Sequence, residues 1–370
     1  MNIRSDFYSG NIRCLSCENA DNVRLEIVKD NNADSFQWFY FMVENAANNR
    51  CQFIIENAGL SSYAEGFSNC QVVASYDQQH WFRVPTTFEN GKLIIQHLIE
   101  SDVIYFSYFA PYLMERHNDF ISSLKESDLV GYDVITRTSD NNTVELITCG
   151  NGKKSAWIIA RQHPGESMAQ WWIEGFVERL IDNDDAVSRF LLGQFTFYIV
   201  PNMNPDGSAR GNLRTNASGI DLNRAWLNPC IESSAEVYWV REKMHDTGVS
   251  FCMDVHGDEC LPYNFIAGAN NIPSWNNRKA EQLNRYRDFL AKINPDFQTE
   301  FGYPPAIEAD LALCNNYVAE QFDCLAMTFE MPFKDADNFP LAKTGWSPSR
   351  CKKMGASNLD AMLFISQFLE

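Results

Sequence analysis

The chain has 370 residues, of which 45% are hydrophobic and 13% aromatic. This length exceeds the usual size of one hydrophobic core, so we expect two domains with ample apolar surface to bury. The formal net charge of −18 argues against nucleic acids and anionic membrane surfaces as partners.

No feature of the sequence predicts export or membrane insertion. The first residues lack the apolar core of a signal peptide, and no run approaches the roughly 18 apolar residues that span a bilayer. Eleven cysteines, an odd number without a regular framework, are typical of reduced thiols. We therefore expect a cytoplasmic protein, and we assign no metal or redox role to the lone Cys-x-x-Cys pair of Cys14 and Cys17.

Residues 1–125 predict a smaller, all-β domain. Short runs rich in β-branched and aromatic residues are separated by Asn, Gly, Ser and Asp turns, and no long amphipathic helix interrupts them. This pattern is typical of a β-sandwich. The pattern turns helical from Glu115 to Lys125, so we place the domain boundary at the end of that helix. The predicted strands lie at 36–43, 52–56, 70–75, 92–96 and 103–110.

Residues 126–370 predict an α/β domain with an open mixed sheet and helices on both faces. Four apolar runs predict strands that end at Ala160, Val200, Val255 and Phe329, and each leads directly into polar residues. Open α/β folds place their chemistry at the carboxyl ends of such strands, so we expect one shared site. Apolar residues at helical spacing predict helices at 168–181, 235–245, 278–293 and 358–368.

The spacing His-x-x-Glu occurs three times, beginning at His97, His163 and His256, so the bare pattern is weak. His97 lies in a half-buried strand pattern and is interpreted as an ordinary sheet histidine. Between His163 and Glu166, Pro164 and Gly165 force a turn from strand to helix. This placement predicts two of the three ligands of a catalytic metal.

The other strand ends have plain structural alternatives when each is taken alone. His256 could be a buried structural histidine, Glu330 a carboxylate that faces water, and Asn-Pro-Asp-Gly at 204–207 a simple turn. Their joint occurrence in this order favours a shared site.

Six short segments, in a fixed order over about 125–370, together resemble the zinc carboxypeptidase family. Within that family they are most similar to the bacterial-type cytosolic carboxypeptidases, which carry a β-sandwich before the catalytic domain, in agreement with the strand pattern of residues 1–125. The segments are His-Pro-Gly-Glu at 163–166, Asn-Pro-Asp-Gly at 204–207, Gly-Asn-Leu-Arg at 211–214, Gly-Ile-Asp-Leu-Asn-Arg at 219–224, Asp-Val-His-Gly at 254–257 and Thr-Phe-Glu at 328–330.

The resemblance implies a zinc metallocarboxypeptidase that acts on the C-terminus of a peptide or protein. It also implies a tyrosine from a mobile loop, for which Tyr303 and Tyr317 are both imperfect candidates. The implied roles are one zinc ion per chain held by His163, Glu166 and His256, Glu330 as general acid/base, Arg214 polarising the scissile carbonyl, and Asn223 with Arg224 binding the terminal carboxylate.

The chemistry of these residues agrees with the implied roles. Two imidazoles and one carboxylate leave a zinc ion an open position for water, as in catalytic sites, and zinc lowers the pKa of that water towards neutrality. Glu330 would move its proton to the leaving amine. Arg214 would face the developing oxyanion, and the guanidinium fork of Arg224 matches a carboxylate.

The sequence leaves the substrate open. The resembled branch removes C-terminal glutamates, which the net charge would repel unless local basic residues such as Arg210, Arg278 or Lys334 overcame it.

A zinc deacylase of N-acyl amino acids, similar to aspartoacylase or succinylglutamate desuccinylase, shares the ligand set, but the β domain and Gly-Asn-Leu-Arg favour a peptidase. A non-enzymatic peptide-binding protein is disfavoured because no ligand or catalytic position is lost. The oligomeric state stays open.

Overall fold

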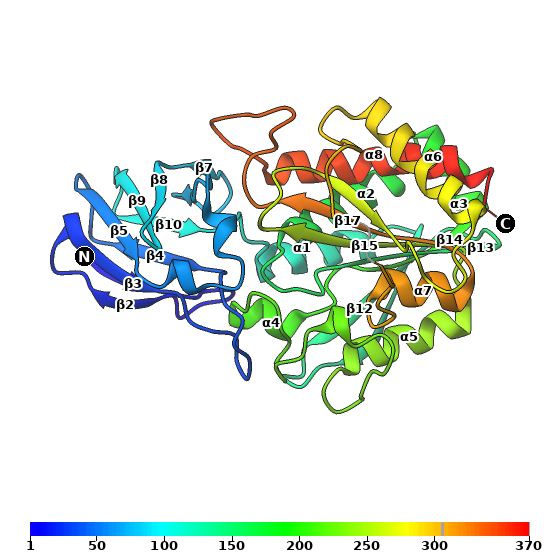
Figure 1. Cartoon of the computed structure of the whole chain (residues 1–370), viewed down its shortest axis with the longest axis horizontal. Coiled ribbons are helices and arrows are strands. Elements are labelled where there is room, and N and C mark those ends of the chain that lie inside the picture. Colours follow the sequence, from blue (N-terminus) through cyan, green and yellow to red (C-terminus); the bar gives the residue numbers. More distant parts are fainter. Residues whose placement is uncertain (305–306, 370) are drawn as a thin grey trace.

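The computed structural model describes residues 1–304 and 307–369. Its N-terminal part is made of two five-stranded sheets, with strand orders β1-β4-β10-β6-β7 and β2-β3-β5-β9-β8 (Figure 1). The strands are β1 (Asn2–Arg4), β2 (Arg13–Ser16), β3 (Val23–Glu26), β4 (Tyr40–Glu44), β5 (Arg50–Ile55), β6 (Val73–Ser75), β7 (Phe82–Arg83), β8 (Thr86–Glu89), β9 (Lys92–Leu98) and β10 (Val103–Ser107), with 3-10 turns η1 (Ala20–Asn22), η2 (Ala58–Leu60) and η3 (Ala64–Phe67).

Aromatic side chains fill the space between these two sheets. Phe106 of β10 lies in one sheet and Phe53 of β5 in the other, and their ring centroids are 5.0 Å apart. Phe41 of β4 stacks on Phe106 at 5.5 Å. The predicted β-sandwich is therefore confirmed. His97 of β9 belongs to this domain, where its Nε2 lies 3.1 Å from the Tyr76 hydroxyl, as expected of a sheet histidine.

The second part is built round one seven-stranded sheet with the order β11-β12-β14-β13-β15-β17-β16. Its elements are α1 (Met114–Lys125), β11 (Val130–Arg137), β12 (Thr143–Cys149), β13 (Lys154–Ala160), α2 (Met168–Leu180), α3 (Ala186–Gln194), β14 (Phe195–Val200), α4 (Pro205–Arg210), η4 (Leu222–Arg224), α5 (Ala235–Thr247), β15 (Phe251–Asp258), β16 (Phe265–Gly268), α6 (Asn277–Ile293), α7 (Cys314–Phe322), β17 (Leu325–Pro332) and α8 (Pro348–Ser366).

The four strands predicted from apolar runs lie side by side and parallel. β13 pairs with β14 and with β15, and β15 pairs with β17, all in parallel register. Their carboxyl ends therefore meet at one edge of the sheet, as predicted. β11, β12 and β16 add antiparallel pairs, which make the sheet mixed.

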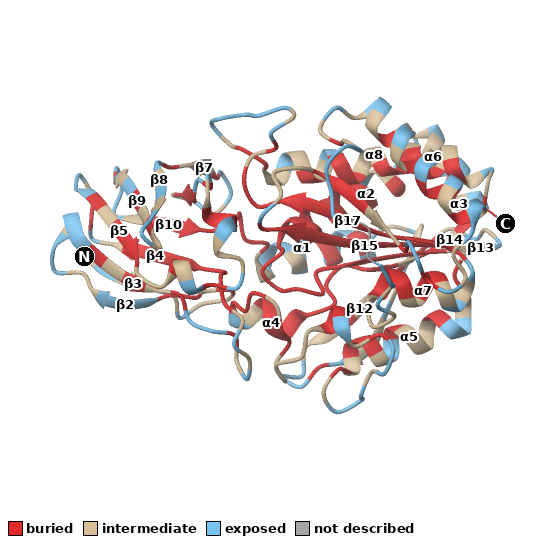
Figure 2. Ribbon diagram, viewed as in Figure 1, coloured by how far each residue is buried: buried red, intermediate tan, exposed pale blue. Residues whose placement is uncertain are grey.

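Helices cover both faces of this sheet (Figure 1), and strands β15 and β17 are buried along their whole length (Figure 2). Alternate residues of β13 serve the two faces, since side chains alternate along a strand. Ile158 packs in the core that includes α2, α6 and α8, whereas Trp157 and Ile159 pack in the core that includes α5 and α7. The predicted α/β architecture is confirmed.

Helix α8 begins ten residues before the predicted start at 358. Two glycines let it approach α2 closely. A Cβ at Gly355 would lie 2.1 Å from the Trp172 carbonyl oxygen, and one at Gly175 would lie 2.1 Å from the Lys352 carbonyl oxygen. Glycine weakens the sequence signal of a helix. Gly355 is required for the close packing on α2, and it also explains why the sequence pattern did not predict the first half of α8.

Helix α1 contacts the second domain through charged side chains. Arg116 pairs with Glu174 of α2 and lies over the ring of Trp171, and His117 pairs with Glu145 of β12. These contacts support a domain boundary before α1, and we propose this position as a refinement of the boundary expected near residue 125.

Among the described residues, no helix is both long and apolar enough to cross a membrane. All eleven cysteines are free thiols, and Cys14 is exposed.

Candidate active site

A cavity of about 780 Å³ opens at the carboxyl ends of β13, β15 and β17, and none of the residues 201–210 that directly follow β14 lines it. All seven residues singled out in the sequence as ligands, acid/base or substrate-binding groups line it: His163, Glu166, Arg214, Asn223, Arg224, His256 and Glu330. The structure thus brings together segments that lie far apart in the chain.

The fold explains how the side chains reach this edge. His163 and Glu166 lie on the turn between β13 and α2, and the Glu166 carboxylate also accepts a hydrogen bond of 3.0 Å from the Gly257 amide. His256 of β15 and Glu330 of β17 are direct partners in the parallel register. Two neighbouring strands therefore present one imidazole and one carboxylate to the same cavity.

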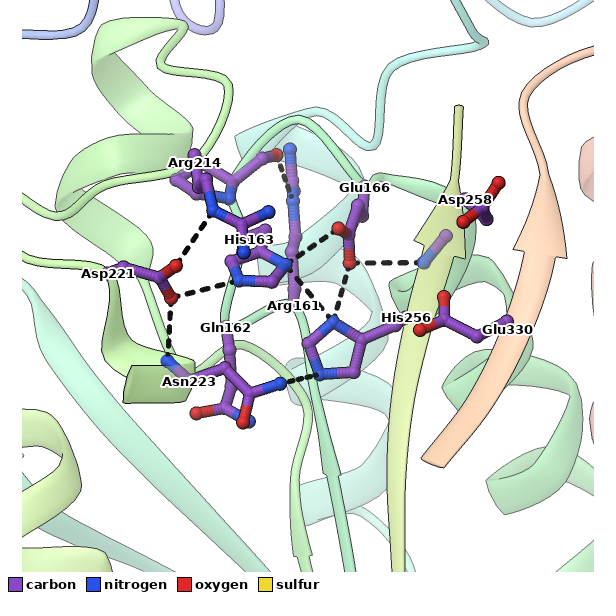
Figure 3. A network of polar contacts seen from close by, with 12 residues as sticks. Arg161, Gln162, His163, Glu166, Arg214, Asp221, Asn223, His256, Asp258 and Glu330 are labelled. Atoms are coloured by element: carbon purple, nitrogen blue, oxygen red, sulfur yellow. Dashed lines mark hydrogen bonds and ion pairs between the residues drawn. The ribbon is translucent and has the colours of Figure 1, made fainter. Parts of the chain in front are cut away.

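His163, Glu166 and His256 converge on one point, and all three are buried (Figure 3). Glu166 Oε1 lies 2.7 Å from His163 Nδ1, and Glu166 Oε2 lies 2.8 Å from His256 Nδ1. The two Nδ1 atoms are 3.2 Å apart. Two imidazole nitrogens that face each other across a carboxylate form a donor set suited to a zinc ion.

The outer nitrogens of both imidazoles face carboxylates. His163 Nε2 lies 3.0 Å from Asp221 Oδ1, and His256 Nε2 lies 2.9 Å from Asp254 Oδ2. A carboxylate behind a histidine fixes the ring so that the other nitrogen is free to bind a metal. The described residues therefore fit zinc on two counts, the convergent donors and the partners that orient them.

The sequence contains a signal for one of these two carboxylates, Asp254, but none for Asp221. Asp254 stands two residues before His256 in the same strand, and a period of two places both on one face. Asp221 lies in the segment that begins at Gly219, and its role depends on how that loop folds back onto His163.

The environment sets the two glutamates apart. Burial disfavours the ionised form of Glu166, but the two imidazoles that face it lower its pKa below the usual range. For Glu330, burial raises the pKa well above the usual range, and the nearby carboxylates of Glu166 and Asp258 raise it further. Glu166 is thus held as an anion, the form that can bind a metal, whereas Glu330 can carry a proton.

Glu330 is 5% exposed and has an oxygen, Oε2, for which the described residues offer no hydrogen-bond partner. Its Oε1 lies 3.1 Å from the Tyr303 hydroxyl oxygen, which also lies 2.8 Å from Asp258 Oδ2, so the single phenolic hydrogen faces both carboxyl groups. A buried carboxyl oxygen without a partner is available to a water molecule or a leaving group in the cavity. Of the two tyrosine candidates, Tyr303 therefore lies at the site, whereas Tyr317 is bonded to His245 and lies outside the cavity lining.

Arg214 is connected through Asp221 to the cluster of His163, Glu166 and His256. Its Nε donates to Asp221 Oδ2 at 2.7 Å, and the other oxygen of that carboxylate faces His163. Asn223 is buried and contacts His256 at 3.3 Å, whereas Arg224 is exposed at the cavity and its Nη1 donates to the Asn223 carbonyl. Three polar groups thus surround the space beside the cluster.

The three basic residues considered for an acidic substrate lie elsewhere. Arg210 pairs with Asp140, Arg278 pairs with Asp323, and Lys334 donates to the Ser68 carbonyl oxygen. None lines the cavity. The cavity contains a different cation, Arg287 of α6, which the sequence pattern gave no reason to select.

The segment Asn-Pro-Asp-Gly begins helix α4 and supports the fold. Asn204 caps the helix because its side-chain oxygen accepts from the Gly207 amide. Its side-chain Nδ2 donates to the carbonyl of Gln162, the residue before His163. Asp206 accepts from the Asp140 amide at 2.9 Å and from Asn142 Nδ2 at 2.8 Å.

Comparison with known proteins agrees with this geometry. The family model of the cytosolic carboxypeptidase N-terminal domain matches residues 3–109, and the zinc carboxypeptidase model matches residues 118–349. Cytosolic carboxypeptidase 6 of Caenorhabditis elegans is 26% identical over 359 residues, which cover 89% of this chain and 78% of that protein.

Two solved structures are similar over almost the whole chain. The metallo-carboxypeptidase of Burkholderia cenocepacia is 42% identical, with a TM-score of 0.97 and 99% of each chain covered. The metallo-carboxypeptidase of Pseudomonas aeruginosa, solved in complex with (2-guanidinoethylmercapto)succinic acid, is 40% identical, with a TM-score of 0.97 and 100% of each chain covered. The chain therefore belongs to the zinc carboxypeptidase family of hydrolytic enzymes and carries the N-terminal domain of its cytosolic branch.

Proposed function

We propose that this enzyme hydrolyses the last peptide bond of peptides or proteins and releases the C-terminal residue. The main support for this proposal is the set of residues that line one cavity. The cavity is lined by the convergent set of His163, Glu166 and His256, by the buried acid Glu330, and by three groups suited to a carboxylate or an oxyanion, Arg214, Asn223 and Arg224.

In this proposal each side chain has a separate task. His163, Glu166 and His256 would hold a zinc ion, which would supply a Lewis acid for the scissile carbonyl and would lower the pKa of water. Glu330 takes the proton of the attacking water on its free oxygen and transfers it to the leaving amine. Arg214 stabilises the negative charge that develops on the carbonyl oxygen.

Arg224 and Asn223 would bind the substrate's terminal carboxylate. A guanidinium presents two parallel N–H groups to a carboxylate, and such charge-assisted pairs are about twice as strong as neutral ones. Arg224 is exposed at the cavity, and among the described residues its guanidinium donates only to the Asn223 carbonyl, so its other nitrogen atoms are available to a ligand. An enzyme built in this way cleaves only next to a free chain end.

Amidation of the substrate's C-terminus is expected to lower kcat/KM by at least about a hundredfold, because the amide leaves the Arg224 guanidinium without its charged partner. A matched peptide pair that differs only in this group, assayed for release of the last residue, measures the effect. Arg224→Ala should weaken hydrolysis of the free acid and reduce the preference between the two peptides.

Arg241 provides the control for this experiment, because its guanidinium donates to the carbonyls of Trp226 and Leu227 away from the cavity lining. Arg241→Ala should keep the full preference for the free acid. Equal rates on both peptides would refute exopeptidase action. Turnover of N-acyl amino acids with no turnover of peptides would indicate a deacylase instead.

We further propose that the released residue is glutamate. Arg287 of α6 lines the cavity, its Nη2 donates to the Thr299 carbonyl oxygen at 3.2 Å, and its Nε has no partner among the described residues. Burial lowers the pKa of this guanidinium, and an acidic side chain would compensate for that cost. A local cation of this kind can overcome the repulsion expected from the net charge of −18.

Peptides that end in Glu or in Gln test this preference. We expect Arg287→Gln to reduce the ratio of kcat/KM for Glu over Gln by about tenfold or more, as for the loss of one charge-assisted bond. Arg285, on the same helix but paired with Glu281 on the surface, provides the control, and Arg285→Gln should keep the ratio. An unchanged ratio in Arg287→Gln would show that a residue other than Arg287 determines the preference for glutamate.

A further inference from the structure

A buried carboxylate of the N-terminal domain binds the loop that carries Arg214. Asp30 lies between β3 and β4 and is 3% exposed. Its Oδ1 accepts from the Leu213 amide at 2.6 Å, and its Oδ2 accepts from the amides of Arg214 at 2.8 Å and Thr215 at 2.9 Å. The Thr215 hydroxyl adds a fourth bond at 3.1 Å. One side chain thus satisfies three successive backbone amides of the other domain.

The same loop is held at its beginning by further contacts between the domains. Asn11 Nδ2 donates to the Gly211 carbonyl at 2.8 Å, and Asn212 Nδ2 donates to Asn31 Oδ1 at 2.7 Å. Gly211 has φ +70°, and a Cβ there would lie 2.6 Å from the carbonyl oxygen of Gly10. The position therefore requires glycine, both for its conformation and for the close approach of the two backbones.

The N-terminal domain also reaches the cavity itself through Tyr63. Gln37, which is buried, fixes the backbone of Tyr63 by accepting from its amide at 2.8 Å and donating to its carbonyl at 3.0 Å. The Tyr63 ring lines the cavity, and its centroid lies 5.7 Å from Arg214 Cζ, within the range of cation–π attraction. The N-terminal domain thus contacts Arg214 from two directions, its backbone through Asp30 and its guanidinium through Tyr63.

We propose that the N-terminal domain is a working part of the active site, in which Asp30 is the positioning residue for Arg214. This inference rests on the role proposed above for Arg214. Asp30 fixes the backbone at 213–215, the Arg214 side chain extends from there to Asp221, and Asp221 in turn orients His163. Without the carboxylate, three amides lose their acceptor and the guanidinium is no longer held where the oxyanion forms.

Asp30→Asn tests the proposal with little change of shape. We expect kcat to fall about 10- to 100-fold while KM changes less than about threefold, because misplacement of a group that acts in the transition state affects the chemical step. In the Arg214→Ala background the same change should cost less than about twofold, since effects transmitted through one residue are not additive. A loss that is as large in that background as in the wild type would overturn the proposal.

Asp34 belongs to the same loop, is exposed and, among the described residues, pairs with Lys29 alone. Asp34→Asn is therefore the matched control and should keep wild-type kcat. Thr215→Val removes a single bond to Asp30 and should lower kcat by only about two- to fivefold, which provides a milder variant in case Asp30→Asn folds poorly.

Amide hydrogen exchange gives a readout that does not depend on turnover. In zinc-loaded Asp30→Asn we expect the segment 212–216 to exchange at least about tenfold faster than in the wild type, with the central strands β13 and β15 unchanged. Unchanged exchange in this segment would overturn the proposal. An inactive wild type would refute the proposed function, and the exchange measurement would still decide whether Asp30 holds the loop.

Discussion

Glu330→Gln is expected to lower kcat by about 10² to 10⁴, the usual cost of losing a general base, while the protein still folds and retains its zinc. The amide keeps the shape of the side chain and an oxygen that can accept the Tyr303 hydroxyl at the position of Oε1. What it loses is the ability to take a proton on the atom that corresponds to Oε2, which has no partner among the described residues. Steady-state kinetics on a free-acid peptide, with elemental analysis of the same sample, measures both quantities.

Glu308 provides the control for this variant, because it is exposed at the margin of the same cavity. Glu308→Gln removes one negative charge from the cavity without removing a buried acid, so kcat should stay within about twofold, as for most surface substitutions. If Glu330→Gln retains more than about a tenth of wild-type kcat, another group must move the proton.

The sequence predicted the position of the candidate site because its residues follow a simple structural rule. His163, His256 and Glu330 each come at or just after the end of an apolar run, and parallel strands bring their carboxyl ends to one edge of a sheet. Once β13, β15 and β17 are recognised as neighbours, their side chains must meet. Pattern and topology together are sufficient for this part of the site.

Residues that act across long sequence separations could not be predicted in the same way. Asp30 meets Arg214 over 184 residues, and nothing in the local sequence of either loop predicts the contact. Tyr63 lies in an irregular segment between η2 and η3 and belongs to the cavity only because the two domains pack together. Contacts of this kind depend on how the domains pack, which one-dimensional patterns do not encode.

Short and irregular elements of the fold were missed for a related reason. β1, β2 and β7 have between two and four residues and no alternation of buried and exposed positions long enough to detect. β16 has four residues and pairs only at the edge of the sheet with β17. Their stability comes from neighbouring strands, so propensity alone does not identify them.

We expect one zinc ion per chain, lost in His163→Ala and in His256→Ala together with activity. Each imidazole presents Nδ1 to the Glu166 carboxylate, and removing either leaves two donors where catalytic zinc sites have three. His80 is exposed and, in the part of the chain that the structure describes, its side chain pairs with Asp77 alone, so His80→Ala should keep the metal. Elemental analysis after gel filtration gives the stoichiometry, and dialysis against a chelator followed by zinc should abolish and restore turnover.

Substitution of a carboxylate behind an imidazole should weaken zinc binding less than substitution of the imidazole itself. Asp254 is fully buried behind His256 and also accepts from Gln162. Asp254→Asn is expected to weaken zinc affinity by about 10- to 100-fold, as is usual when a partner that orients a histidine ligand is lost. Competition with a chromogenic chelator measures this affinity, and the order should be wild type, then Asp254→Asn, then His256→Ala. If the double variant of His163→Ala and His256→Ala still binds one zinc ion per chain, the metal binds at another place in the molecule, because the proposed site would then retain a single donor, Glu166.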